Sequence, residues 1–108
     1  MKIIRNRKNV TYVFEGEMDN YQIQQIKDVC RYDIDFAKPK VVRLHFGKVT
    51  FIDSTGLGFV LARYKQVQAY GGELRLCEVS EPVRKVFTIS GVFSLIPLEE
   101  KRQKEAVQ

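Results

Sequence analysis

The 108-residue chain has one histidine, His45, and only two cysteines, Cys30 and Cys77. These are too few residues for the usual sets of zinc ligands or for a disulfide framework. Both cysteines fall in segments that have the pattern of a helix or a strand, where a reduced cysteine behaves as a small buried apolar group. The sequence therefore predicts neither a metal site nor a disulfide.

Long apolar runs are also missing. No stretch approaches the roughly 20 apolar residues that a membrane-spanning helix requires. The polar start, residues 1–7, lacks the apolar region of a signal peptide. There is also no Gly-x-x-x-x-Gly-Lys-Ser/Thr loop and no set of kinase motifs, so no nucleotide or other cofactor is expected. These absences predict a soluble, cytoplasmic protein that does not enter a membrane.

The net charge of +5 raises the question of nucleic acid or an anionic membrane surface as a partner. The charges are divided rather than gathered into one basic stripe. The first ten residues hold four bases and no acid, whereas residues 15–35 hold six acids: Glu15, Glu17, Asp19, Asp28, Asp33 and Asp35. No RNP-like aromatic motif, zinc-finger spacing or helix-turn-helix pattern is present, so direct nucleic-acid binding is not expected.

Two short apolar stretches, residues 2–4 and 10–15, are separated by polar residues 5–9, a pattern typical of a β-hairpin. Further strands are predicted at residues 41–46, with Gly47 and Lys48 as the following turn, at residues 73–78, and at residues 92–98. Strands that alternate with helices indicate parallel neighbours joined by right-handed crossovers.

Helices are predicted between these strands. Asp19 is a good N-cap for a helix whose apolar residues recur at helical spacing up to the Lys38-Pro39 step. A second helix begins near Ser54, with one apolar face formed by Leu57, Val60, Leu61, Tyr64 and Val67, and ends before Gly71. Ser80 and Pro82 open a third helix that Gly91 closes, and residues 99–108 are expected to form a final, frayed helix.

The resulting prediction is a single α/β domain over residues 1–108. Its sheet is mixed and mostly parallel, has four to five strands and begins with a hairpin, and about four helices pack on it. No internal repeat, low-complexity segment or linker divides the chain.

The segment from residue 49 to residue 58 carries the chemistry. An apolar run ends in Asp53-Ser54-Thr55-Gly56, and a helix begins at once. The first backbone N–H groups of a helix lack partners and its dipole adds positive charge, so a phosphate on Ser54 would be stabilised there. Gly56 and Gly58 would let another protein approach closely. The plain alternative is that Asp53 or Ser54 only caps the helix.

The longer context favours phosphorylation. Residues 51–58, residues 61–66 and the Gly71-Gly72-Glu73-Leu74 segment resemble the phosphorylation-site helix of bacterial anti-sigma factor antagonists, which are STAS domains. Residues 14–19 match the Gly-Glu-hydrophobic-Asp segment of that family, and residues 86–93 match its third helix and turn. Through residues 63–66 and 90–93, the chain is most similar to the branch that frees the first forespore-specific sigma factor during sporulation.

The resemblance implies a regulatory protein, not an enzyme. In this cycle the unphosphorylated antagonist binds an anti-sigma factor that is also an ATP-dependent serine kinase, and the sigma factor is released. The kinase then phosphorylates the serine that matches Ser54, which switches binding off, and a PP2C-type serine phosphatase resets the antagonist. Partner-binding residues carried over from the resemblance are Glu17, Asp19, Asp53, Ser54, Thr55, Gly56, Leu57 and Arg63.

Several of these residues have plainer interpretations. Glu17 and Asp19 are expected on a loop after the second strand, beside the serine, but Asp19 could equally be a helix cap. Arg63 could face the partner, although a solvated surface charge is the favoured interpretation. Thr55 is an alternative acceptor, but the order of residues aligns Ser54 with the phosphorylated position of the family.

Three other functions fit the sequence less well. A hydrolase with Ser54 as nucleophile, His45 as base and Asp53 as orienting acid lacks a Gly-x-Ser-x-Gly elbow. A receiver-type aspartyl phosphate on Asp53 lacks the acidic pair that would hold magnesium. The main alternative is a STAS scaffold or adaptor in a different, stress-signalling partner-switching complex. The basic isoelectric point near 9.3 leaves the identity of the partner open.

Overall fold

The computed structural model describes residues 1–99. Five strands form one sheet in the order β1-β2-β3-β4-β5: β1 (Lys2–Asn6), β2 (Asn9–Met18), β3 (Val41–Ile52), β4 (Glu73–Cys77) and β5 (Leu98–Glu99). The β1–β2 pair is antiparallel and the other three pairs are parallel. The predicted mixed, mostly parallel sheet that begins with a hairpin is confirmed.

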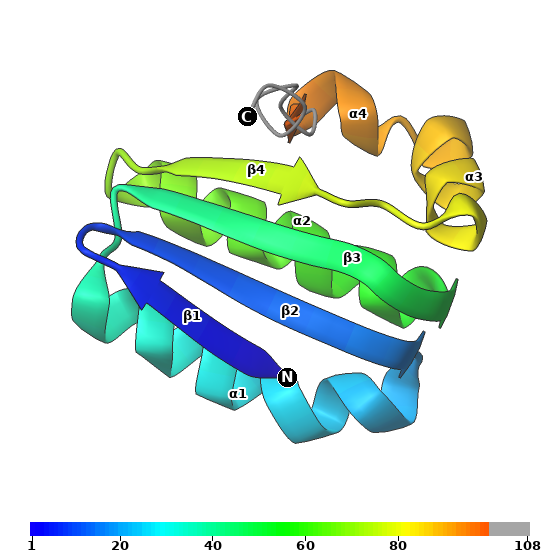
Figure 1. Ribbon diagram of the computed structural model, residues 1–108, viewed down its shortest axis with the longest axis horizontal. Coiled ribbons are helices and arrows are strands. Elements are labelled where there is room, and N and C mark those ends of the chain that lie inside the picture. Colours follow the sequence, from blue (N-terminus) through cyan, green and yellow to red (C-terminus); the bar gives the residue numbers. More distant parts are fainter. Residues whose placement is uncertain (100–108) are drawn as a thin grey trace, which may run out of the picture.

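Four helices complete the described fold: α1 (Asn20–Ala37), α2 (Ser54–Ala69), α3 (Glu81–Ser90) and α4 (Val92–Leu95). Helices α1 and α2 lie side by side on one face of the sheet, and α3 and α4 lie beyond β4 (Figure 1). None of the helices within residues 1–99 is long and apolar enough to span a lipid bilayer.

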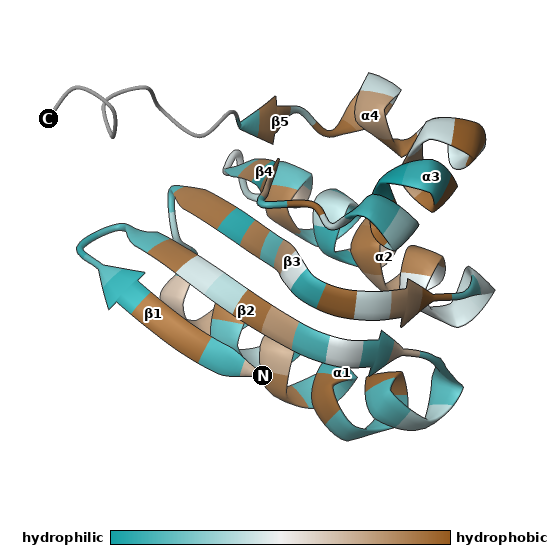
Figure 2. Ribbon diagram, turned by 45° about the vertical axis from the view of Figure 1, so that its right-hand side comes forward, coloured by the Kyte–Doolittle hydropathy of each residue, from teal (hydrophilic) through white to brown (hydrophobic). Residues whose placement is uncertain are grey.

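The core lies between the sheet and the helices. In the first halves of β2 and β3 every second side chain is buried toward the helices. Figure 2 shows hydrophobic residues recurring along both strands. Phe46 of β3 joins two sides of this core, because its ring stacks on Phe14 at 5.2 Å and meets the edge of Phe87 in α3 at 5.4 Å. Aromatic packing thus fixes α3 against the sheet.

The sheet is longer at its centre than the sequence predicts. Gly47 and Lys48 do not form a turn; β3 continues through them to Ile52, because Lys48 and Val49 pair with Glu15 and Gly16 of β2. Strand β2 likewise continues to Met18, with register shifts on both sides of the Glu15–Gly16 step. Both strands therefore run on to the point where α1 and α2 begin.

The predicted strand at residues 92–98 is wrong. Val92 and Ile96 are both buried whereas Ser94 between them is exposed, although all three would share one face in a strand, so the pattern fits the helical turn α4. The Ile96 N–H donates to the Val92 carbonyl at 2.9 Å, and the ring of Phe93 meets the edge of Phe87 at 5.8 Å. Only Leu98 and Glu99 form β5, and the rest of the helix predicted at 99–108 lies outside the described residues.

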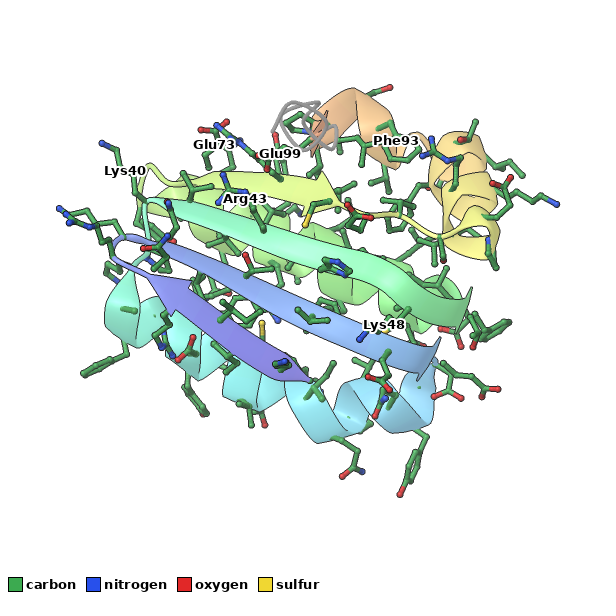
Figure 3. All side chains as sticks on the ribbon, viewed as in Figure 1. Lys40, Arg43, Lys48, Glu73, Phe93 and Glu99 are labelled. Carbon is green, nitrogen blue, oxygen red and sulfur yellow. The ribbon has the colours of Figure 1, made fainter. Side chains whose placement is uncertain are left out.

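The short strand β5 is held to the sheet by charge as well as by backbone pairing. Arg43 of β3 and Glu99 of β5 point toward each other across β4 (Figure 3), with 2.5 Å between Arg43 Nε and Glu99 Oε1. Arg75 of β4 lies 3.8 Å from the other carboxylate oxygen of Glu99. This ion-pair cluster ties three neighbouring strands together on the face of the sheet opposite α1 and α2.

Candidate functional site

The candidate site lies where β2 and β3 end and α2 begins. These strands are parallel, so their carboxyl ends meet at one edge of the sheet, with Met18 paired to Ile52 and Glu17 paired to Phe51. Helix α2 starts two residues after β3 ends. The tight connection places Ser54 in the first turn of α2, beside the end of β2.

Asp53, rather than Ser54, is the N-cap of α2. The Asp53 carboxylate oxygen Oδ1 accepts hydrogen bonds from the backbone N–H of Thr55 at 2.9 Å and of Gly56 at 3.1 Å. Two of the unpaired donors of the first turn are thereby satisfied. Ser54 is the first helical residue, it is exposed, and its hydroxyl makes no hydrogen bond within residues 1–99. The alternative of Ser54 as the cap is therefore wrong, and its hydroxyl is available to another protein.

The rest of the first turn divides between packing and surface. A Cβ on Gly56 would come 2.5 Å from the Met18 carbonyl oxygen and 2.6 Å from Ile52 Cγ1, so this glycine is required by the close approach of α2 to β2 and β3. Leu57 is half-buried and packs against the core, whereas Gly58 is exposed and has open space around it. Of the two glycines, only Gly58 thus leaves the surface free for a partner.

Acidic residues lie at the same edge of the sheet as the exposed serine. Glu17 is exposed near the end of β2, not on a loop as expected, because the strand continues through it. Asp19 is the N-cap of α1 and accepts a hydrogen bond from the Gln22 N–H at 3.0 Å. The nearest base along β3 is Lys48, which pairs in register with Glu15 (Figure 3). The edge of the site is therefore mainly acidic.

An exposed aromatic residue at this edge was missed by the sequence analysis. Phe51, which pairs with Glu17 and precedes Ser54 by three residues, keeps 47% of its surface exposed. The sequence gave no sign that Phe51 is exposed, because residues 49–52 have the apolar pattern of a buried strand end. Ile52 is buried and Phe51 points to the other face of the sheet, so an exposed apolar side chain lies at the same sheet edge, three residues before the serine.

Arg63 differs most from expectation. It is not a solvated charge: the side chain is only 7% exposed and lies in the stripe that α2 buries, composed of Gly56, Phe59, Val60, Arg63 and Val67. Burial lowers the pKa of the Arg63 guanidinium, and the group lies 5.1 Å from the centre of the Phe59 ring. Most residues of the apolar face that the sequence predicted for α2 are only half-buried. The buried stripe is shifted around the helix, because α2 is covered by α1 as well as by the sheet.

His45 is not positioned as the base of a hydrolase. It lies on the face of the sheet opposite α2, and its Nδ1 accepts a hydrogen bond from the Gly47 N–H at 3.3 Å. No contact joins it to Ser54 within the described part of the chain. The arrangement around Ser54 consequently has an acceptor hydroxyl, a helix N-terminus and acidic neighbours, which together suit phosphorylation and docking.

Comparison with known proteins places this site in context. The chain matches the STAS domain family over residues 1–105. It is 31% identical over 83 residues to the anti-sigma F factor antagonist of Paenibacillus polymyxa, covering 77% of this chain and 71% of the relative. It is 27% identical over 100 residues to the anti-sigma-B factor antagonist of Bacillus subtilis, covering 92% and 89% of the two chains.

Solved structures agree. The anti-sigma factor antagonist SpoIIAA in its unphosphorylated form has a TM-score of 0.81 at 28% identity, over 98% of this chain and 91% of that chain. The phosphorylated form of SpoIIAA from Bacillus has a TM-score of 0.72 at 27% identity, over 98% and 95%. The family match, the sequence identities and the structural similarity show that this chain belongs to the STAS domain family, among the anti-sigma factor antagonists.

Proposed function

We propose that this protein binds an anti-sigma factor, releases the sigma factor that it holds, and is switched off by phosphorylation of Ser54. The observation that carries the proposal is the exposed Ser54 hydroxyl at the first position of α2, left free because Asp53 occupies the cap. The anti-sigma factor is also the ATP-dependent serine kinase, and a PP2C-type serine phosphatase restores the unphosphorylated form. The protein acts by binding and is not itself an enzyme.

The chemistry of the switch is electrostatic. Phosphorylation adds about −1.5 to −2 charge units and three acceptor oxygens beside Asp53 and near the exposed Glu17. A partner that fits the neutral serine must then bury a poorly paired charge. A penalty of about 3 kcal/mol would weaken binding on the order of 100-fold, which is enough to release the partner.

The same site can hold the phosphate in the free protein. The N-terminus of α2 carries partial positive charge, and the remaining backbone N–H groups of its first turn can face the phosphate. Ser54 is exposed, so the added group meets no buried side chain. Phosphorylation should consequently block the surface locally and leave the core packing around Gly56 unchanged.

The partner-binding surface extends over the residues carried over from the family. Glu17 presents an acid to a basic partner, the first turn of α2 presents the exposed Ser54 hydroxyl, and Phe51 adds an exposed apolar contact. Asp19 and Asp53 contribute through the helix starts that they cap. Arg63 contributes from beneath the surface, since it supports the packing of α2 against α1.

The sigma factor that we propose is the sporulation type. An anti-sigma F factor antagonist and SpoIIAA are both among the relatives, and the chain covers most of each. The second candidate is a scaffold or adaptor in a stress-signalling partner-switching complex. The anti-sigma-B factor antagonist of Bacillus subtilis, matched over 92% of this chain, favours keeping this alternative.

The test is affinity capture from lysate of the source organism with Ser54→Ala and Ser54→Asp baits, followed by mass spectrometry of the retained proteins. Thr88→Ala is the control, because it removes an exposed hydroxyl of α3 that is not among the partner-binding residues. We expect Ser54→Ala and Thr88→Ala to retain an ATP-binding anti-sigma kinase that Ser54→Asp loses. The purified kinase and ATP should then add one phosphate to wild type and none to Ser54→Ala.

Retention of the same proteins by the Ala and Asp baits would show that Ser54 is structural and would overturn the switch. Capture of a stress-signalling complex by the Ala bait alone would favour the second candidate. Where the Ala bait alone captures an anti-sigma factor, the identity of that factor gives the sigma factor.

A further inference from the structure

A groove runs between α1 and α2 behind the candidate site. It has a volume of about 340 Å³, within the usual size of a small-molecule site. The residues that line it are Ile23, Gln24, Lys27, Asp28, Arg31, Thr55, Gly58, Phe59, Ala62 and Arg63. Its polar members on α1 fall at helical spacing, so they form one face of that helix beside α2.

The floor of the groove holds a buried cation, Arg63, that has no anionic partner among the described residues. Arg63 is 7% exposed, its Nε makes no hydrogen bond, and no ion pair within residues 1–99 involves its guanidinium. The acids closest to it are engaged elsewhere: Asp28 pairs with Arg31 at 3.1 Å, and Asp35 accepts a hydrogen bond from Gln66 at 2.7 Å. A buried guanidinium left in this state is unfavourable, and an anion in the groove would relieve it.

The walls add further positive charge. Lys27 lines the groove and makes no ion pair within the described residues, and Arg31 lies above it with its partner Asp28. Three cations and one acid therefore face the same space. This excess is better matched by a dianion than by a single carboxylate, and the forked guanidinium of Arg63 suits phosphate oxygens.

The lining of the groove is also partly apolar. Ile23, Phe59 and Ala62 line the groove, and Gly58 leaves its mouth open. A volume of 340 Å³ exceeds what a free phosphate fills, so an organic group attached to the phosphate would contact these side chains.

We propose that the α1–α2 groove binds a small phosphomonoester, with the phosphate on Arg63 and Lys27 and the organic part against Phe59. The site shares Thr55 and Gly58 with the first turns of α2, so its occupant would lie beside the surface that Ser54 presents. The inference does not depend on phosphorylation of Ser54, because it rests on Arg63 and can be tested without any partner protein.

The test is an NMR titration of the ¹⁵N-labelled full chain at constant ionic strength, with inorganic phosphate, phenyl phosphate and acetate as separate probes. We expect both phosphates to shift the Arg63 Nε–Hε signal and the backbone amides of Thr55 and Gly58 in a saturable way. Phenyl phosphate should bind about threefold more tightly than inorganic phosphate, because its ring contacts the apolar wall. Acetate should bind at least about tenfold more weakly.

Matched variants separate the groove from general surface charge. Lys27→Gln should weaken phenyl phosphate binding by about threefold, whereas Lys65→Gln, which removes an exposed lysine of α2 outside the groove, should have no effect. Arg63→Lys keeps the charge and loses the fork, and should weaken binding by about tenfold. The amide spectrum of each variant shows whether it is folded.

Equal loss in Lys27→Gln and Lys65→Gln, or shifts confined to lysines outside the groove, would overturn the proposal. Saturable binding of inorganic phosphate with no gain from the phenyl group would overturn the organic part and assign the groove to free phosphate. A positive result leaves the Ser54 switch to be judged by its own capture experiment.

Discussion

The first turn of α2 lies so close to β2 that a Cβ at Gly56 would stand 2.5 Å from the carbonyl oxygen of Met18. This contact joins the start of the helix that carries Ser54 to the end of a neighbouring strand. The position of the serine is therefore set by packing of the backbone, and a rigid support lies beneath an exposed hydroxyl.

Gly56→Ala should lower the free energy of unfolding by roughly 2–4 kcal/mol, because the added methyl group meets a backbone carbonyl and the Ile52 side chain at distances that force a shift. Gly58→Ala is the matched control. It has open space around it on an exposed helical surface, so alanine should stabilise by up to about 1 kcal/mol. Urea unfolding of both variants measures the difference, and equal effects would contradict the close approach at Gly56.

Asp53→Ala should cost about 1 kcal/mol of stability, because Thr55 and Gly56 lose their capping acceptor. Asp53→Asn should retain most of this stability, since asparagine is an equally good N-cap. Ser54→Ala should change the unfolding free energy by less than about 0.5 kcal/mol, because the exposed hydroxyl has no partner. A large loss in chemical denaturation of Ser54→Ala would mean that the serine, and not Asp53, supports the helix.

Tyr12→Phe should destabilise the protein by about 1–2 kcal/mol. The buried Tyr12 hydroxyl donates to Asp33 Oδ2 at 2.5 Å and links β2 to α1, and its removal leaves a part-buried carboxylate short of a donor. Arg5 donates to the other oxygen of Asp33, but its side chain is 49% exposed, so Arg5→Gln should cost less than about 1 kcal/mol. Thermal unfolding ranks the pair, and a larger loss in Arg5→Gln would contradict this assignment.

Alkaline pH should destabilise the fold through buried thiols. Burial raises the pKa of the Cys30 thiol from 9.0 to about 12 and that of Cys77 to about 11. The folded chain then keeps protons that the unfolded chain loses, so stability is fully present below pH 9 and falls as pH rises above it.

Cys30→Ala removes one of these groups. Between pH 10 and pH 11, its unfolding free energy should therefore fall less steeply than that of the wild type, by about 1 kcal/mol per pH unit. Urea unfolding at several pH values measures this slope. The cavity left by alanine lowers the curve by a constant amount and does not alter its slope. Parallel curves for the wild type and Cys30→Ala would show that Cys30 titrates normally in the folded protein.

Phosphorylation at Ser54, or the Ser54→Asp substitution, should leave amide exchange in β3 unchanged, because the exposed site is separated from the core by the packed first turn. Hydrogen exchange followed by mass spectrometry checks this expectation. Changed protection confined to α2 would fit a local blockade, whereas altered exchange along β3 would indicate refolding of the sheet.

Much of the fold could be predicted because its signals are local. The apolar period of α1, the polar break between β1 and β2, and the glycine that ends α3 each depend on residues adjacent in the chain. The position of Ser54 at the start of a helix could also be predicted, because an apolar run ends there, a capping residue follows, and the apolar residues then recur at helical spacing. These features need no knowledge of what lies across the sheet.

Where contacts between distant segments decide the structure, the local sequence pattern was misleading. Residues 92–95 have the composition of a strand, yet they form a helical turn that buries Val92 and Ile96 in the core and leaves Ser94 exposed. Gly47 suggests a turn, yet the backbone of β2 beside it keeps β3 extended. Propensity was overruled in both cases by contacts that form only after folding.

For the site, the sequence by itself determined which serine stands at the start of α2 and which acids come near it in the chain. Only the tertiary structure decided that Asp53 takes the cap and leaves Ser54 free, that Gly56 is held against Met18, and that Arg63 is buried. The physical reason is that capping and burial depend on which groups compete for the same space, and α1 and the sheet cover α2 from two sides.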